Sequence, residues 1–149
     1  MSSLRDSLSA GGLRNLIASQ IQPGAVFVIL DPIAKKEKFI VILGVDAGKI
    51  WVGTLFINSE KNVNFIKTLE QHGLQFIIKA SNYEFLDYDS FINASNIIRR
   101  QFEKLVDIII ARDGRYLTQI IPKDFDYIRA RMADSKVVST ADKKDFGLI

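Results

Sequence analysis

The sequence contains no cysteine and a single histidine, His72. The absence of cysteine excludes disulfide bonds, thiolate nucleophiles, iron–sulfur clusters and zinc sites with cysteine ligands. One histidine cannot form a histidine-pair metal site, and its place just before a predicted helix end favours an interaction with the helix dipole. We therefore expect no cofactor and no metal site.

Long apolar runs are missing as well. The sequence has no run of 18 uncharged apolar residues, so we expect no membrane-spanning helix and no membrane partner. The first residues include Arg5, Asp6 and Arg14 without a long apolar segment, which is not typical of a signal peptide. These absences predict a cytoplasmic protein.

The composition is that of a globular protein. Of the 149 residues, 48% are hydrophobic and 25% are charged, which is enough to bury an apolar core in a single domain over residues 1–149. The formal net charge of +3 permits binding to nucleic acid without requiring it.

Residues 24–59 carry the clearest structural pattern. Three apolar, β-branched runs at 25–31, 38–45 and 49–57 are separated by two short polar connections, the second with Gly48 at a position that suits a positive φ. Three strands joined by short turns predict an antiparallel meander, which tends to curl because strands twist and open edges need cover. We therefore predict an α+β fold with a small, curled antiparallel β-barrel decorated by helices.

The segments around this meander alternate between helical and strand patterns. Apolar residues at helical spacing predict helices at 13–21 and 62–72. Strands are predicted at 74–80 and 85–94. Together with the meander, the strands make a barrel core of about residues 23–94.

The part of the chain at about 95–149 is predicted to be a helical extension of the core. Ser95 is a candidate cap for a helix, but the β-branched run at 106–110 favours a strand, and the pattern leaves both open. Pro122 suits the first turn of a C-terminal helix. Ser139 resembles the start of a capping box for a short last helix.

The candidate chemistry lies on the meander. Lys35, Lys36 and Lys38 follow the first strand, and Asn58 and Ser59 end the third. Antiparallel pairing brings the start of the second strand close to the end of the third, so we expect Lys38 near Ser59. An ammonium group and a hydroxyl at one place can stabilise a phosphoryl group. The alternative is that the lysines only protect a sheet edge and Asn58-Ser59 only opens a turn.

Other polar residues have weaker patterns. Asp87 and Asp89 could hold a divalent cation, although two carboxylates alone are a weak signal. Ser90 could bind a substrate or could tie a loop to the barrel. Arg99 and Arg100 are predicted to lie on a solvated helix face.

The order of these features resembles the MazF/PemK-like toxin family, the small SH3-like barrels of toxin–antitoxin systems, of which this chain would be a divergent member. The matching pieces are PGAV at 23–26, KFIVIL at 38–43 and FINS at 56–59. The phrase FLDYDSFI at 85–92 and the helix at 122–134 also match a divergent branch. The resemblance implies an SH3-like β-barrel.

The resemblance also implies metal-independent cleavage of single-stranded RNA, in which the 2′-hydroxyl of the RNA attacks the adjacent phosphorus. By position, Lys38 replaces the usual arginine and Ser59 the usual threonine as catalytic residues. Lysine lacks the planar fork with which arginine binds phosphate, so the activity could be weaker or lost. Members of the family are commonly homodimers with a protein antitoxin. Four further residues would bind the RNA: Lys35, Lys36, Asn58 and Ser90.

Two other functions stay open. A barrel of this kind can be a non-catalytic protein-interaction module in which the lysines only keep an edge soluble. The chain could also be a metal-dependent nuclease that uses Asp87 and Asp89.

Overall fold

The computed structural model describes residues 9–32, 35–59 and 68–149 of the chain. The strands in these residues are β1 (Ala25–Asp31), β2 (Lys36–Val45), β3 (Trp51–Asn58), β4 (Gln75–Ile78), β5 (Ser90–Asn93), β6 (Ile98–Gln101) and β7 (Arg115–Gln119). The helices are α2 (Ala10–Gln20), α3 (Leu69–His72), α4 (Phe102–Ala111), α5 (Pro122–Asp134) and α6 (Thr140–Asp145), with a short 3-10 helix, η1, at Ala80–Asn82.

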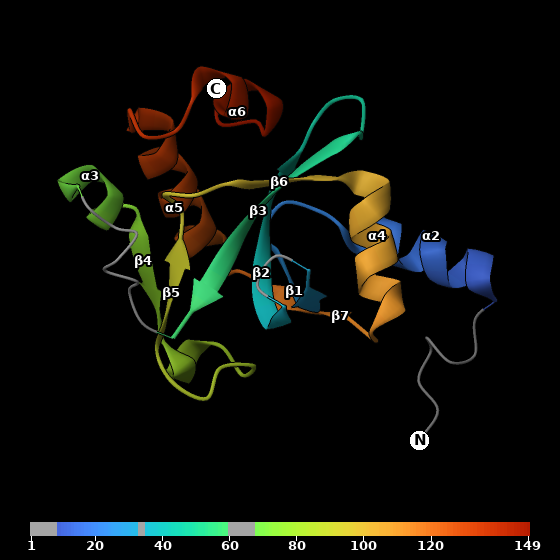
Figure 1. Cartoon of the computed structure of the whole chain (residues 1–149). Coiled ribbons are helices and arrows are strands. Elements are labelled where there is room, and N and C mark those ends of the chain that lie inside the picture. The colour runs from blue at the N-terminus through green and yellow to red at the C-terminus, as the bar shows by residue number, and fades with distance from the viewer. Residues whose placement is uncertain (1–8, 33–34, 60–67) are drawn as a thin grey trace.

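The described strands form one curled antiparallel sheet (Figure 1). Its order is β4-β5-β3-β2-β1-β7, and β6 pairs with β3 outside this path. The outer edge of β3 is shared, since β6 pairs with its first half and β5 with its last two residues. The fold is therefore α+β with a barrel-like sheet, as the sequence predicted.

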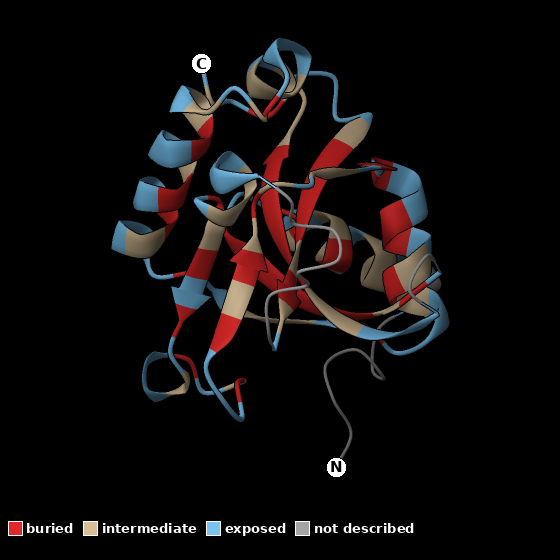
Figure 2. Cartoon of the chain, turned by 60° about the vertical axis from the view of Figure 1, so that its left-hand side comes forward, coloured by how far each residue is buried: buried red, intermediate tan, exposed pale blue. Residues whose placement is uncertain are grey.

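Each face of the sheet supports a separate part of the core. Alternate residues of β1 point to opposite faces: Phe27 and Ile29 pack with α2 and α4, whereas Val26 packs with α5 and α6. Figure 1 shows these two pairs of helices on opposite sides of the sheet. Buried residues run along the central strands and the inward faces of the helices (Figure 2). Among the described helices, none combines the length and apolarity that a membrane crossing requires.

The predicted meander is confirmed, with small shifts. The first strand has the predicted bounds, the second begins two residues earlier at Lys36, and the third runs from Trp51 to Asn58. In the turn between β2 and β3, the positive φ falls on Lys49, at 54°, and not on Gly48. The turn is held by the Asp46 carboxylate, which accepts hydrogen bonds from the backbone N–H groups of residues 50 and 51.

The predictions for residues 62–94 were only partly correct. The predicted helix ends as expected at His72, with Thr68 in a capping box, but residues 62–67 lie outside the described residues. The predicted strand at 85–94 is wrong for its first half, because only Ser90–Asn93 pairs. Before it, the Asp89 carboxylate accepts a hydrogen bond from the backbone N–H of Ala80, which folds this segment into a loop.

The segment after residue 94 is not only a helical extension, because it contributes β6 and β7 to the sheet. Ser95 does not cap a helix: its hydroxyl donates to the Asn93 side chain, and α4 begins seven residues later. The β-branched run at 106–110 is helical because one face of α4 is buried against the sheet. Pro122 begins α5 and Ser139 caps α6, as predicted.

Candidate functional site

An open cavity of about 280 Å³ lies where β3 ends. The last paired residues of β3 are Ile57, opposite β2, and Asn58, opposite β5. Beyond this point the start of β2 and the segment at 86–90 both line the cavity. Four of the six predicted site residues line it: Lys36, Lys38, Ser59 and Ser90.

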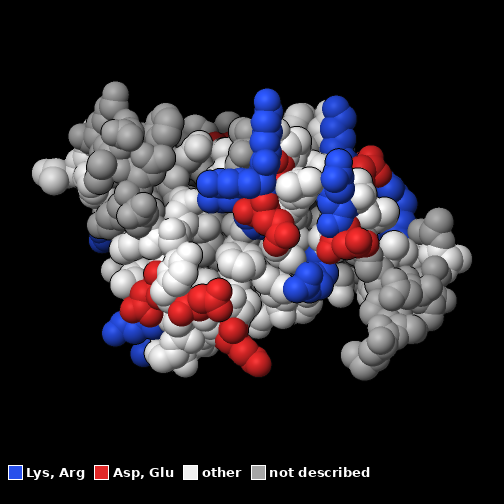
Figure 3. Space-filling model, turned by 60° about the horizontal axis from the view of Figure 1, so that its bottom comes forward, with Lys and Arg blue, Asp and Glu red and all other residues white. Residues whose placement is uncertain are grey.

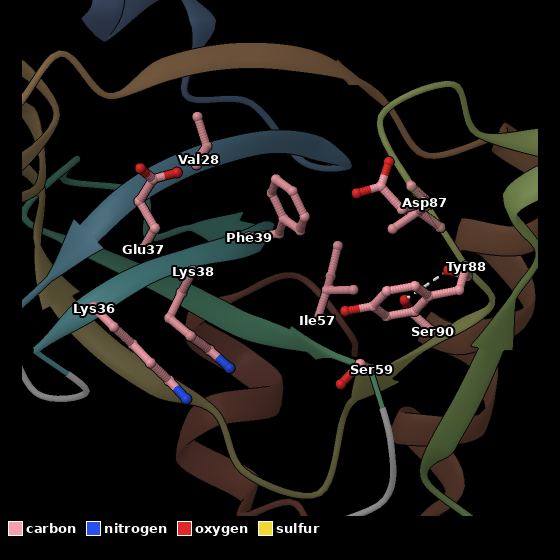
Figure 4. A pocket seen from close by; sticks show the side chains of 11 residues that line it. Val28, Lys36, Glu37, Lys38, Phe39, Ile57, Ser59, Asp87, Tyr88 and Ser90 are labelled. Carbon is pink, nitrogen blue, oxygen red and sulfur yellow. Dashed lines mark hydrogen bonds between the residues drawn. The ribbon is translucent and has the colours of Figure 1, made fainter.

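The pleat of β2 gives the cavity two kinds of wall. In Figure 4 the side chains of Lys36 and Lys38 leave one side of β2, and those of Glu37 and Phe39 leave the other. The lysine side lies toward α4, and the Phe39 side packs against the core under α5. An occupant of the cavity therefore meets ammonium groups on one wall and an aromatic ring with a carboxylate on the other.

Lys38 is the best-defined cation of the site. Its Nζ donates a hydrogen bond of 2.6 Å to Asn58 Oδ1 and lies 5.1 Å from the centre of the Phe56 ring. Burial lowers the pKa of the Lys38 ammonium, the positive charge of Lys36 lowers it further, and the carboxylate of Asp31 acts against both. The predicted Asn58 thus joins the site as the partner of Lys38.

The two predicted serines differ in their surroundings. Ser59 is exposed in the bend that follows β3. Ser90 is only 4% exposed, and its hydroxyl donates to the backbone carbonyl of Tyr88 at 3.0 Å. This hydrogen bond fits the structural role that the sequence left open, so Ser59 is the hydroxyl that a ligand can use as a donor.

Lys35 is not part of this cavity. It lies in the turn before β2 with a positive φ of 57°, and its backbone N–H donates to the carbonyl of Asp31. It borders a separate hollow between the end of β1 and α4. The cluster of three lysines in the sequence is therefore divided between two places.

A buried ion pair lies behind Lys38 on the same face of the sheet. Arg100, which is 7% exposed, contacts the fully buried Asp31 at 2.7 Å, and its Nε donates to the Thr54 hydroxyl. The prediction of a solvated helix face for Arg99 and Arg100 is wrong, because both residues lie on β6. Alternation along this strand sends Arg100 into the protein.

Arg99 projects to the other side of β6. It lies over the rings of Trp51 and Phe146 and forms ion pairs with Asp142 and Asp145 of α6. Arg99 thereby fixes the C-terminal helix against the sheet. Phe146 fits there because β3 carries a glycine at 53, where an added Cβ would lie 2.7 Å from the ring.

Sequence reasoning missed several residues of the cavity, among them Glu37, which lies between Lys36 and Lys38 on β2. Tyr88 is 62% exposed and lines the opening, and Phe39 contributes the aromatic wall. An exposed tyrosine between two aspartates in the loop was the available signal. Aromatic rings beside a phosphate site can stack on bases.

The two aspartates of that loop are divided. Asp87 lines the cavity, whereas Asp89 is bonded to the backbone of Ala80. In the described part of the chain, no three or more His, Asp or Glu side chains gather into a cluster that could hold a metal ion.

Figure 3 shows the face seen from the bottom of Figure 1, where basic and acidic side chains are interspersed rather than gathered into one basic surface. Any recognition of an anion there depends on local geometry more than on net charge.

Comparison of the chain with family models, with curated proteins and with solved structures finds no match.

Proposed function

We propose that the cavity at the end of β3 binds a phosphodiester of single-stranded RNA, and that the protein is a toxin-like endoribonuclease that needs no metal ion. The observation that carries the proposal is the grouping of Lys36, Lys38 and Ser59 around one open cavity, with Asn58 bonded to Lys38. A half-buried ammonium group beside an exposed hydroxyl matches the needs of a phosphoryl group that gains negative charge.

The proposed reaction is an internal transfer. The 2′-oxygen of the RNA attacks the adjacent phosphorus, the bond from phosphorus to the 5′-oxygen breaks, and the products are a 2′,3′-cyclic phosphate and a 5′-hydroxyl. Lys38 balances the charge on the non-bridging oxygens and Ser59 donates a hydrogen bond to one of them. Glu37 or Asp87, which line the same cavity, accepts the 2′-hydroxyl proton, and water protonates the leaving 5′-oxygen.

Cleavage of unstructured RNA by the purified chain in EDTA tests this proposal. We expect cyclic phosphate ends, and no cut where the attacking nucleotide is 2′-deoxy. Lys38→Ala should reduce cleavage by about two orders of magnitude, in the range for loss of one charge-stabilising donor, without changing the melting temperature. Lys104→Ala, an exposed lysine of α4, is the matched control and should cleave normally.

Two results would contradict the assignment. Cleavage that persists unchanged in Lys38→Ala would mean that another group carries the charge. Cleavage that EDTA abolishes would favour the metal-dependent nuclease with Asp87. Sedimentation of the same sample tests the homodimer that the resemblance implies, and co-purification with a neighbouring gene product tests the antitoxin.

A second function, a non-catalytic protein-interaction module, is favoured by a different surface. The edge strand β4 carries Ile77, 54% exposed, and the adjacent α5 carries Tyr127, 60% exposed. Tyr127 packs edge-on against Phe76 of β4, so exposed aromatic and aliphatic side chains lie at the strand that ends the sheet in the described part of the chain. Absence of cleavage on any RNA, with no growth arrest on expression, would favour this function.

A further inference from the structure

A second and larger hollow lies beside the cavity at the end of β3. Its volume is about 650 Å³, within the ~300–1,000 Å³ typical of ligand sites. The two share Val28, Glu37 and Phe39 as lining residues, so they form one continuous groove across β1 and β2. The groove runs from the lysines of β2 toward β7 and the loop that begins at η1.

The floor of this hollow is apolar and aromatic. Phe39, Phe85 and Leu117 line it, and all three are only partly buried where they pack on the core. The two phenylalanine rings meet edge to face, with centres 5.1 Å apart. The arrangement leaves flat apolar surface open to a planar group.

The rim of the hollow is polar and carries carboxylates. Two carboxylates, Glu37 and Glu84, line it with one guanidinium, that of Arg115, and with the polar side chains of Asn82, Thr118 and Gln119. Carboxylates repel a phosphate but accept hydrogen bonds from amino groups, as in the pairing of glutamate with the cytosine amino group. Because two carboxylates stand against one guanidinium among the described lining residues, the hollow suits an uncharged base better than a second phosphate.

We propose that this hollow is a nucleobase subsite, and that it selects a base with an exocyclic amino group for the nucleotide next to the phosphate at Lys38. Adenine, cytosine and guanine carry such a group, whereas uracil offers Glu84 only its ring N3–H, which lies between two carbonyl oxygens that the carboxylate repels. Unstacked bases of single-stranded RNA are commonly held in this way, on aromatic rings and by their edges. The inference rests on the proposed function, from which it takes the position of the phosphate.

Binding of uncleavable oligonucleotides tests the subsite. The probes are four RNA hexamers, 2′-deoxy at the cleavage position, that carry A, C, G or U at one site in a uridine background. Fluorescence anisotropy should show that at least one amino-bearing base binds about tenfold more tightly than uridine. Glu84→Gln should reduce this preference to less than about threefold, and Asp126→Asn, an exposed acid of α5, should leave it unchanged.

A preference that survives both Glu84→Gln and Phe85→Leu would overturn the subsite, as would equal binding of all four hexamers. Lys38→Ala separates this failure from failure of the proposed function, since it should weaken all four hexamers by one factor and keep the preference. If no hexamer binds, titration with adenosine and cytidine decides. NMR shifts at Phe85 and Leu117 would then support the subsite, and their absence would overturn it.

Discussion

Two cations contact the same aromatic ring from different depths. The Cζ of Arg100 lies 5.8 Å from the centre of the Phe56 ring, and the Nζ of Lys38 lies 5.1 Å from it. Arg100 is buried and its charge is balanced by the buried carboxylate of Asp31. Lys38 is half-buried, and its hydrogen-bond partner, Asn58, is neutral.

This difference separates a structural cation from one that can serve a ligand. The charge of Arg100 is compensated inside the protein and is closed off from the cavity. The hydrogen bond to Asn58 orients Lys38 without neutralising it, and the cavity gives an anion access to that charge. The position along β3 separates the two roles. Thr54, in the middle of the strand, accepts a hydrogen bond from the buried Arg100, and Asn58, at the end beside the cavity, accepts one from Lys38.

The largest expected effect comes from breaking the buried pair. Arg100→Met should lower the free energy of unfolding by about 3–5 kcal/mol, because it removes the cation that contacts the buried Asp31 carboxylate. Urea unfolding followed by circular dichroism measures this change. Adding Asp31→Leu should restore much of the loss, since the double variant buries no uncompensated charge.

The control for this prediction is an exposed arginine with two acidic partners. Arg14 pairs with Glu103 and Asp107 between α2 and α4, at 2.6 and 2.7 Å, and all three side chains are well exposed. Arg14→Met should cost much less stability than Arg100→Met, because solvent-exposed ion pairs contribute little. Equal losses of unfolding free energy in Arg14→Met and Arg100→Met would contradict the difference between buried and exposed cations.

A neutral buried donor should have an intermediate effect. The Tyr83 hydroxyl donates to Asp124 at 2.6 Å and accepts from the backbone N–H of Ile121, which ties the loop after β4 to the start of α5. Tyr83→Phe should cost about 1.5–3 kcal/mol in urea unfolding, as expected for a hydrogen bond to a charged group. A loss below about 0.5 kcal/mol would mean that water replaces the hydroxyl.

The same residue gives a pH dependence with a defined sign. Burial, and then the Asp124 carboxylate, raise the pKa of Tyr83 above its ordinary value. Its contribution to stability is therefore complete below about pH 10, the ordinary tyrosine pKa, and is lost as the pH rises toward the folded value. The wild type should lose more stability than Tyr83→Phe when unfolding is measured at increasing pH above 10.

The fold was predictable where its determinants are local. Strands β1 to β3 follow from three apolar, β-branched runs and two polar connections, and α5 follows from Pro122 and helical spacing. Strand β6 was missed because Arg99 and Arg100 interrupt any apolar pattern, and its partner residues in β3 lie far away in the sequence. The segment is a strand through its pairing with Trp51–Thr54 of β3, and Asp31 and Phe146 contact its two arginines on opposite faces.

The candidate site also has features that the sequence predicts and features that it does not. The approach of Lys38 to Asn58 follows from the register of the meander, which fixes neighbours across two adjacent strands. The separation of Lys35 was not predictable, because a positive φ at that residue turns it toward the hollow beside α4. The cavity itself depends on the loop at 86–90, which the sequence pattern presented as a strand.

The smallest expected effect is that of Lys36 on the pKa of Lys38. Lys36 is exposed and lowers the pKa of Lys38, so Lys36→Gln should raise that pKa toward the ordinary lysine value. If RNA binding needs the charged form of Lys38, the alkaline loss of binding should then move to higher pH, with Lys104→Gln as the control that leaves it in place. Side-chain NMR of Lys38 measures the same shift directly.

The lowered pKa of Lys38 also gives the free energy of unfolding a pH dependence. Because the pKa of Lys38 is lowered in the folded state, the unfolded chain binds more protons between the two pKa values, and wild-type stability gains as the pH rises through that range. Lys36→Gln should reduce this gain while changing stability at neutral pH by no more than about 0.5 kcal/mol. An unchanged or further lowered Lys38 pKa in Lys36→Gln would mean that the charge of Lys36 does not act on Lys38 and that burial alone lowers the Lys38 pKa.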